Sequence, residues 1–219
     1  GMAGGTNLSL EAFVEASALP RVFSAGGWKD VLRADAVLDE FGVTDVVMLG
    51  SGDGYQRAEA LAATGARMAI PVDYPAGYDV SDPHLARMIG LDELKHWELA
   101  PSNASRLHKA GVPLAFTAHG LSDVSEFLAG VRKAVDEGLP EEEALNALTS
   151  NPATWLGLQK DLGSLRAGRV ANVLVTDGPL FESGTHLVEH WVAGQPTPMR
   201  DRHPLDLAGT YNVNVDDSV

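Results

Sequence analysis

The chain has 219 residues, enough for one large domain with a buried core but short for a complete (β/α)8 barrel of roughly 250 residues. Its 16 basic and 30 acidic residues give a net charge of −14, which disfavours nucleic acid and anionic membranes as partners. Cysteine is absent, so disulfides, thiolate nucleophiles and cysteine-ligated zinc are excluded. No apolar run reaches the ~20 residues of a membrane span, and residues 1–5 lack the basic and apolar regions of a signal peptide.

The first two thirds of the chain alternate short apolar runs with helical patterns, which is typical of a parallel sheet built from βα units. Strands are expected at residues 21–25, 46–49, 67–72 and 113–117. Helices are expected at residues 28–41, 53–65 with Asp53 as the cap, 103–110, 123–137, from Pro140, and from Asn151 to about Gly157. A stretch rich in Pro, Gly, Tyr and Asp, residues 73–83, predicts a long surface loop.

Beyond Gly163 the pattern changes to short β-rich runs joined by turns. Strands are expected within residues 163–168, 170–176 and 187–193, and a subdomain boundary is placed near Leu158. The tail from Pro196 is rich in proline and charge, but residues 211–215 alternate in hydropathy like a strand.

Four segments stand out together: Phe116–Gly120, Leu145–Gly157 with its Asn-Pro-Ala, Gly163–Val175 and Trp191–Gly194. They resemble the C-terminal part of the amidohydrolase superfamily, most closely its imidazolonepropionase-like branch, and residues 21–72 are similar to that family's fifth and sixth βα units and seventh strand. The resemblance implies an α/β fold: the second half of a (β/α)8 (TIM-like) barrel, followed by a small β-rich subdomain. The implied division is half-barrel βα units in residues 1–157, β-subdomain strands in 158–195 and a tail in 196–219.

The resemblance also implies a chemistry, in which a metal-activated water attacks an amide or ring C–N bond at the C-terminal ends of the barrel strands. The family holds zinc or another divalent metal with His-x-His on the first strand, a His on the fifth, a His on the sixth and an Asp on the eighth. Here the fifth-strand position falls at Ser24, the sixth at Gly50 or Ser51, and the eighth at Ala118. Hydroxyl and methyl groups are poor substitutes for these ligands. We therefore expect a vestigial pocket that holds no metal, and we assign no catalytic residue. The pocket is expected to consist of Ser24, Gly50, Ser51, Thr117, Ala118 and His119.

Two explanations remain open for a half-barrel without ligands. The chain is a fragment whose active segment, with its His-x-His, lies upstream, or it is a degenerate copy kept for assembly or binding. Alone it is expected to be inactive and to need no cofactor. Because half a barrel leaves two unpaired sheet edges, the expected partner is a homo-oligomer copy or an upstream amidohydrolase segment.

Two further motifs have simpler interpretations. His186 to His190 matches the metalloprotease pattern H-x-x-E-H, but the segment has the pattern of a strand, in which the two imidazoles stand about 13 Å apart. The glycine-rich turn Gly50–Gly54 lies where backbone amides could bind an anion, yet it lacks the third glycine of a dinucleotide fingerprint, and a tight turn is favoured.

Overall fold

The computed structural model describes residues 7–16 and 19–199. These residues form two compact units, which divide between Arg169 and Val170. The first unit holds a four-stranded parallel sheet and the second a three-stranded antiparallel sheet, so the chain has the expected α/β class. Among the described residues, no helix combines the length and the apolar character needed to cross a membrane.

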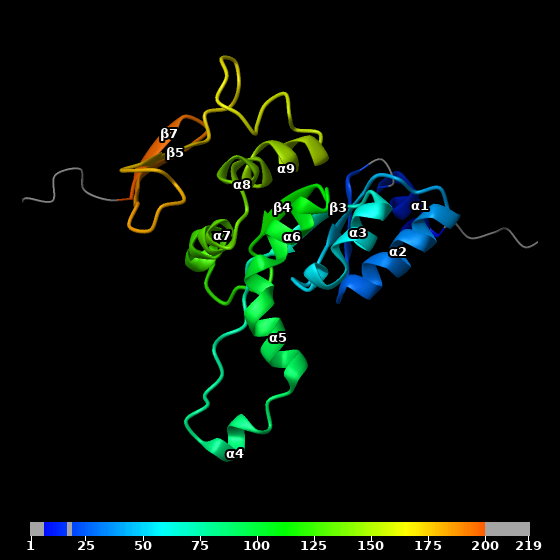
Figure 1. Ribbon diagram of the computed structural model, residues 1–219. Coiled ribbons are helices and arrows are strands. Elements are labelled where there is room, and N and C mark those ends of the chain that lie inside the picture. The colour runs from blue at the N-terminus through cyan, green and yellow to red at the C-terminus, as the bar shows by residue number, and fades with distance from the viewer. Residues whose placement is uncertain (1–6, 17–18, 200–219) are drawn as a thin grey trace, which may run out of the picture. The chain divides into compact units, whose positions relative to one another are not determined.

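The sheet of the first unit follows the chain order β1-β2-β3-β4, and helices connect successive strands (Figure 1). This is the arrangement of consecutive βα units. The strands are β1 (Arg21–Ser24), β2 (Val46–Leu49), β3 (Arg67–Pro71) and β4 (Leu114–Thr117). The α-helices are α1 (Leu8–Glu15), α2 (Trp28–Glu40), α3 (Ala58–Thr64), α4 (Pro83–Ala86), α5 (Leu91–Leu99), α6 (Asn103–Lys109), α7 (Phe127–Asp136), α8 (Glu141–Leu148) and α9 (Ser150–Trp155). Short 3-10 helices are η2 (Gly54–Arg57), η3 (Ala100–Ser102) and η4 (Val124–Glu126).

A row of apolar side chains crosses the parallel sheet and forms much of its core. The strand register places Phe23 beside Met48, Met48 beside Met68, and Met68 beside Leu114. Met48 and Met68 are each 2% exposed, and Leu114 is also buried. Because central parallel strands are covered on both faces, they carry continuous apolar runs, and the strand predicted at residues 46–49 is confirmed.

Two predicted helices are each divided into a 3-10 turn and an α-helix. The helix expected from Asp53 becomes η2 and α3, and the one expected at residues 123–137 becomes η4 and α7. In the first case Tyr55 donates its backbone N–H to Asn103 Oδ1 at 2.7 Å, so this amide has a tertiary partner instead of a helical one. The predicted stop at Gly65 is confirmed, since this glycine adopts a left-handed φ of +69°.

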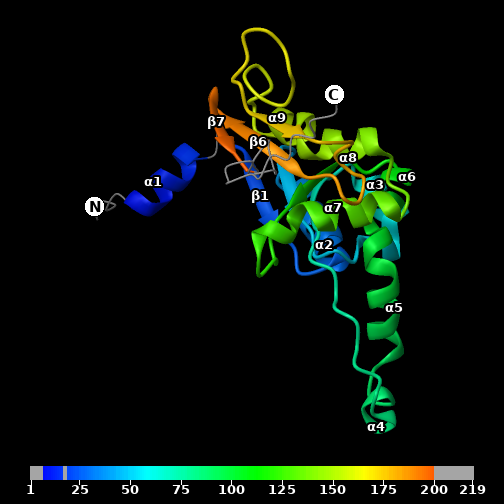
Figure 2. The same ribbon diagram turned by 90° about the vertical axis from the view of Figure 1, so that its left-hand side faces the viewer.

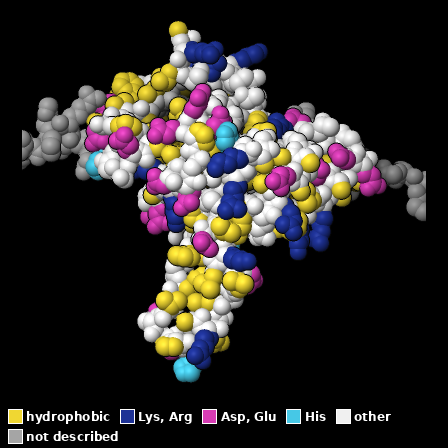
Figure 3. All heavy atoms as spheres, in the orientation of Figure 1, with side chains coloured by type: hydrophobic (Ala, Val, Ile, Leu, Met, Phe, Trp, Pro, Cys, Tyr) yellow, Lys and Arg dark blue, Asp and Glu magenta, His cyan; other side chains and the backbone are white. Residues whose placement is uncertain are grey.

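The stretch after β3 has no regular structure from Val72 to Asp82, as expected of a long loop. It leads into α4 and α5, which lie away from the four-stranded sheet in both views (Figures 1 and 2). Apolar side chains are gathered over this part of the surface (Figure 3). The exposed ones are Tyr78, Val80, Leu85, Met88, Leu91, Leu94 and Trp97.

The second unit contains a sheet in the order β5-β6-β7, with both pairs antiparallel. Its strands are β5 (Val173–Thr176), β6 (Leu187–Val192) and β7 (Gln195–Pro198). The strands predicted within residues 170–176 and 187–193 are confirmed as β5 and β6.

Two details of the predicted β-rich region were wrong. Residues 163–168 contain no strand, because the glycines at both ends adopt left-handed φ values of +83° and +85° that belong to turns. A strand begins at Gln195, where only a proline-rich tail was expected; an edge strand tolerates Pro196 and Pro198 because one side of its backbone needs no ladder partner. The strand predicted at residues 211–215 lies outside the described residues.

Candidate functional site

The carboxyl ends of β1, β2 and β4 lie together at one end of the parallel sheet because the strands all run in the same direction. We call that end, where the strands finish, the carboxyl edge of the sheet. Ser24 ends β1, Gly50 and Ser51 follow β2 directly, and Thr117 ends β4. Ala118 and His119 continue from Thr117. The structure thus places all six predicted pocket residues at the sheet edge where barrel enzymes hold their catalytic groups.

The register distinguishes the two positions predicted to replace the sixth-strand ligand. Ser24 is paired with Leu49, and successive side chains alternate between the faces of a strand, so Ser51 returns to the face of Ser24 while Gly50 does not. A Cβ at Gly50 would lie 3.1 Å from Met68 Cε, on the other face. A side chain at Gly50 would thus be directed towards Met68 and not towards the face of Ser24.

The side chains at this edge do not form a set that suits zinc. Ser24 and Ser51 present hydroxyl groups, and Ala118 presents a methyl group. His119 is exposed, and its backbone N–H donates to Thr117 Oγ1 at 3.2 Å. No group of three or more His, Asp or Glu side chains within the described part of the chain is arranged to hold a metal ion. Since zinc in proteins binds imidazole, thiolate or carboxylate groups, these residues do not fit a zinc centre of their own.

Asp53 is a residue of this edge whose role the sequence did not reveal. It was expected to cap the helix that follows it, but its carboxylate makes no such bond. Instead Asp53 Oδ1 accepts the backbone N–H of Trp28, the first residue of α2, and the hydroxyl of Ser51, each at 2.9 Å. Asp53 therefore caps α2 from the neighbouring loop and also accepts the hydrogen bond of the Ser51 hydroxyl.

Asp73 is a second carboxylate that the sequence analysis placed only in a loop. It follows the end of β3 and lies against Gly120, the residue after His119: a Cβ there would be 2.8 Å from Asp73 Oδ2. Gly120 also adopts a φ of +92°, which a residue with a side chain rarely takes. The position of Asp73 just beyond a buried parallel strand is the signal that would have found it, because such positions converge at one edge.

The two simpler interpretations agree with the geometry. His190 lies on strand β6 and His186 just before it, and His186 Nδ1 contacts Asp177 Oδ2 at 3.3 Å; the strand predicted for this segment is confirmed. In the glycine-rich turn after β2, the Gly50 amide donates to the Ala69 carbonyl at 2.9 Å. Just beyond the turn, the Tyr55 amide donates to Asn103 Oδ1 and the Gln56 amide to the Asp53 carbonyl at 3.1 Å. These three amides are therefore engaged within the chain.

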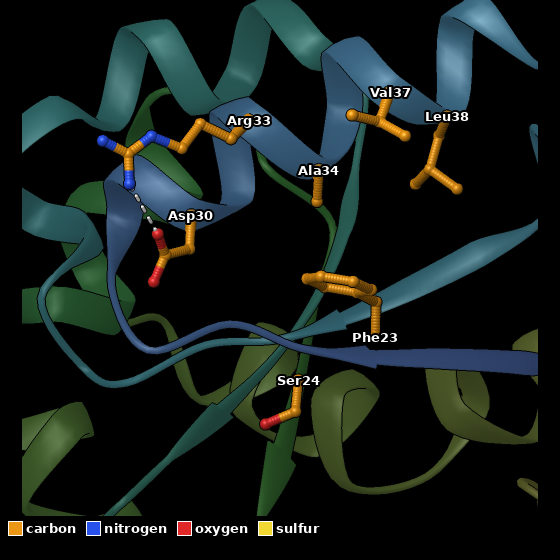
Figure 4. Close-up of a pocket in the computed structure, with 7 residues that line it drawn as sticks. All are labelled: Phe23, Ser24, Asp30, Arg33, Ala34, Val37 and Leu38. Carbon is orange, nitrogen blue, oxygen red and sulfur yellow. Dashed lines mark hydrogen bonds and ion pairs between the residues drawn. The ribbon is translucent and has the colours of Figure 1, made fainter.

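A groove of about 360 Å³ lies beside β1. Its apolar part consists of Phe23 and the α2 residues Ala34, Val37 and Leu38, and Figure 4 shows the Phe23 ring directed towards α2 while Ser24 points to the opposite side of the strand. Asp30 and Arg33 form an ion pair of 3.0 Å at one end of this groove. Ser24 also lines the groove, although its hydroxyl points to the other side of β1 (Figure 4).

Comparison with known proteins places these features in a family. Residues 52–202 match the family described as "Amidohydrolase family". The chain is 28% identical over 95 residues to "Amidohydrolase tasK" of Hapsidospora irregularis, which covers 43% of this chain and 10% of that protein. It is 37% identical over 68 residues to "Putative N-acetylgalactosamine-6-phosphate deacetylase" of Escherichia coli (strain K12), which covers 31% of this chain and 38% of the relative.

A solved structure shows the same fold. The amidohydrolase from Thermotoga maritima MSB8 superposes with a TM-score of 0.67 at 24% identity, over 89% of this chain and 48% of that protein. The chain thus spans about half the length of this neighbour and less than half of the two relatives. The predicted half-barrel followed by a small antiparallel sheet is confirmed as a fold. With the family match extending over more than half of its residues, the chain belongs to the amidohydrolase family.

Proposed function

We propose that this chain is the second half of an amidohydrolase-type barrel that has lost the metal ligands of its strand ends and does not catalyse hydrolysis alone. The reaction class of the complete barrel is hydrolysis of a non-peptide C–N bond. The names of the two relatives, an amidohydrolase and a putative deacetylase, support this class. The imidazolonepropionase-like branch remains a prediction.

The observation that carries the proposal is the chemistry of the strand ends. In such barrels a divalent metal supplies an activated water at neutral pH. The positions that would hold it contain the Ser24 hydroxyl, the Ser51 hydroxyl and the Ala118 methyl group. The Ser51 hydroxyl is moreover bonded to Asp53, and the carboxylate of Asp53 is used to cap α2. We therefore assign these residues a structural role.

The proposal is tested by the metal content of the purified chain. Elemental analysis without added zinc should find well below one ion per chain, and a chelator should leave the thermal unfolding midpoint unchanged, because a ligand that binds only the native state raises this midpoint. A His119→Ala variant serves as the comparison, since His119 is the one imidazole among the six pocket residues. Stoichiometric zinc that is lost in His119→Ala would overturn the proposal and indicate a site centred on His119.

A second candidate function is that of a structural module which completes a larger assembly. The outer strand β1, which is open on one side, favours it. Within the described residues β1 pairs with β2 alone, and an unpaired edge strand attracts another strand. Light scattering of the chain at several dilutions tests whether it associates. A homo-oligomer would support assembly through copies of this chain, whereas a monomer that persists on dilution would exclude it.

A further inference from the structure

Residues 74–99 form a projection from the first unit that we call the arm. It contains most of the loop after β3, then α4 and α5, and it extends away from the four-stranded sheet in both views (Figures 1 and 2). The loop leads out along the arm and α5 leads back, and a Cβ at Gly77 would lie 3.9 Å from Trp97 Nε1. The arm therefore reaches beyond the helices that flank the sheet, which leaves its surface available to another molecule.

The arm is fixed by polar contacts of its own. Asp82 Oδ1 accepts a backbone N–H of α4 at 2.8 Å, and Glu93 Oε2 accepts the Gly90 amide at 2.7 Å at the start of α5. Towards the other end of α5, His96 Nδ1 lies 3.2 Å from the Tyr55 hydroxyl oxygen, and the two rings stack with their centroids 5.9 Å apart. Because these contacts hold the helices in place, the arm presents a surface that is ordered before a partner binds, which lowers the entropy cost of association.

The arm exposes large apolar side chains along its length (Figure 3). Leu91, Leu94 and Trp97 are spaced by three residues, so they follow one side of α5. A helix that packs only on its own domain directs such a row inwards, whereas this row is exposed. The exposed fractions lie between 36% and 79% for Tyr78, Val80, Leu85, Met88, Leu91, Leu94 and Trp97.

The size of this apolar surface suits an interface between two chains. A fully exposed large apolar side chain presents roughly 150–250 Å², so the exposed fractions leave about 700 Å² on each arm. Monomeric proteins rarely expose an apolar patch larger than about 300–600 Å². A stable interface buries about 800 Å² from each partner, and the arm alone provides most of this area.

Charge and symmetry favour a second copy of this chain as the occupant. Residues 83–97 contain two acidic side chains, Asp92 and Glu93, and two basic ones, Arg87 and Lys95, so this stretch is neutral although the chain carries a net charge of −14. Two arms can therefore meet without the repulsion that the acidic remainder of the surface would cause. In a twofold pair a single contact covers the same apolar surface on both copies, and each copy supplies both signs of charge to the other.

We propose that two copies of this chain form a dimer in which α4 and α5 of one arm pack against α4 and α5 of the other about a twofold axis. The apolar side chains of the arm form the centre of the contact and its charged side chains form the rim. The contact uses neither the carboxyl edge of the sheet nor β1, so the inference goes beyond the proposed function and does not depend on it. Zinc content and dimer mass are separate measurements, and either can fail without the other.

Leu91→Glu tests the contact, with Val124→Glu as the matched control. Leu91 and Val124 are both 68% exposed, and each is the first residue of a helix, α5 or η4, where a carboxylate is favourable. Both variants add one negative charge and should fold, which circular dichroism checks. Light scattering over about a hundredfold dilution should show a dimer of the unmodified chain, a dissociation constant raised at least about tenfold by Leu91→Glu, and one changed less than about twofold by Val124→Glu.

A thiol provides a second readout that adds no charge. The chain has no cysteine, so Met88→Cys places a single thiol on the arm, and Leu165→Cys places one at similar exposure elsewhere in the first unit (79% and 77%). Maleimide labelling of Met88→Cys should slow about tenfold as the protein concentration rises through the range in which the dimer forms. Leu165→Cys should label at a constant rate over the same range.

Three results would each overturn the inference. A chain that stays monomeric at every dilution would mean that a different polypeptide covers the arm. A dimer that Leu91→Glu leaves unchanged, with Met88→Cys labelled equally fast at all concentrations, would place the contact on another surface such as β1. Equal loss of the dimer in Leu91→Glu and Val124→Glu would indicate a general effect of charge instead of a contact through the arm.

Discussion

Asp53 and Trp28 are joined across 25 residues of sequence by a hydrogen bond of 2.9 Å from the Trp28 backbone N–H to the carboxylate. Trp28 begins α2, and the preceding Gly27 has no side chain to cap the helix. A Cβ at Gly27 would lie 3.0 Å from Asp53 Oδ2, so the glycine also leaves room for the carboxylate. One carboxylate thus ties the loop after β1 to the loop after β2, at the edge where barrel enzymes hold their ligands.

Replacing Asp53 with alanine should destabilise the first unit. The change leaves the Trp28 amide and the Ser51 hydroxyl without their acceptor, which costs about 1–2 kcal/mol in the free energy of unfolding. Asp53→Asn retains an acceptor oxygen and should lose less. Urea unfolding followed by circular dichroism measures both variants, and equal stability of Asp53→Ala and the natural chain would contradict the capping role.

A methyl group added at Gly130 should destabilise the chain although alanine favours helices. Gly130 lies in α7, and a Cβ there would be 2.7 Å from Val72 Cβ and 2.8 Å from the Val72 carbonyl oxygen. The overlap at the end of β3 should cost about 1–3 kcal/mol, against a gain of roughly 1 kcal/mol from helix propensity. Thermal unfolding of Gly130→Ala checks whether the net change in stability is a loss. The control is Ala129→Ser at the neighbouring position, where the unfolding midpoint should change little. A higher midpoint for Gly130→Ala would show that α7 does not pack this closely.

Asn103 should be essential for the turn that follows β2. Its side chain is buried, and its Oδ1 accepts the amide of Tyr55 at 2.7 Å. Asn103→Ala would leave a buried amide without a partner, at a cost of about 1–3 kcal/mol. Hydrogen exchange of the Tyr55 amide reports the loss directly, and the exposed Asn172 provides the comparison Asn172→Ala in the second unit. Unchanged protection of Tyr55 would mean that another acceptor replaces Asn103.

Acid should loosen the start of β6 through Asp177. The His186 backbone N–H, which donates to this carboxylate at 2.7 Å, and the nearby imidazole hold the pKa of Asp177 below its ordinary value. A carboxyl group with a lowered folded-state pKa stabilises the folded form above its unfolded-state pKa, and this contribution is lost as the pH falls through the folded-state pKa. The change should therefore occur below about pH 4. NMR titration of the His186 amide follows it, and Asp177→Asn should abolish the transition; a midpoint above pH 4 would contradict the assignment.

The sequence predicted the strands of the parallel sheet well because their signal is local. The run at residues 46–49 is apolar throughout, and a strand covered on both faces requires this. The sequence missed β7 because Pro196 and Pro198 resemble a loop, and only the pairing with β6 shows that an edge strand accommodates them. It also predicted that Asp53 caps the helix after it, since an aspartate before a helix usually binds that helix's own amides, whereas Asp53 binds the first amide of α2.

What the sequence determined by itself is the order of βα units and the residue types at the strand ends, since hydropathy periods and side-chain chemistry are properties of adjacent residues. The serines and the alanine at residues 24, 51 and 118 already exclude the usual zinc ligands at those positions. Only the tertiary structure decided that Asp53 binds Trp28, that Asp73 lies against Gly120 and that Phe23 is exposed at the end of a buried row. Each of these depends on which distant segments become neighbours, and that is determined by the packing of the whole sheet.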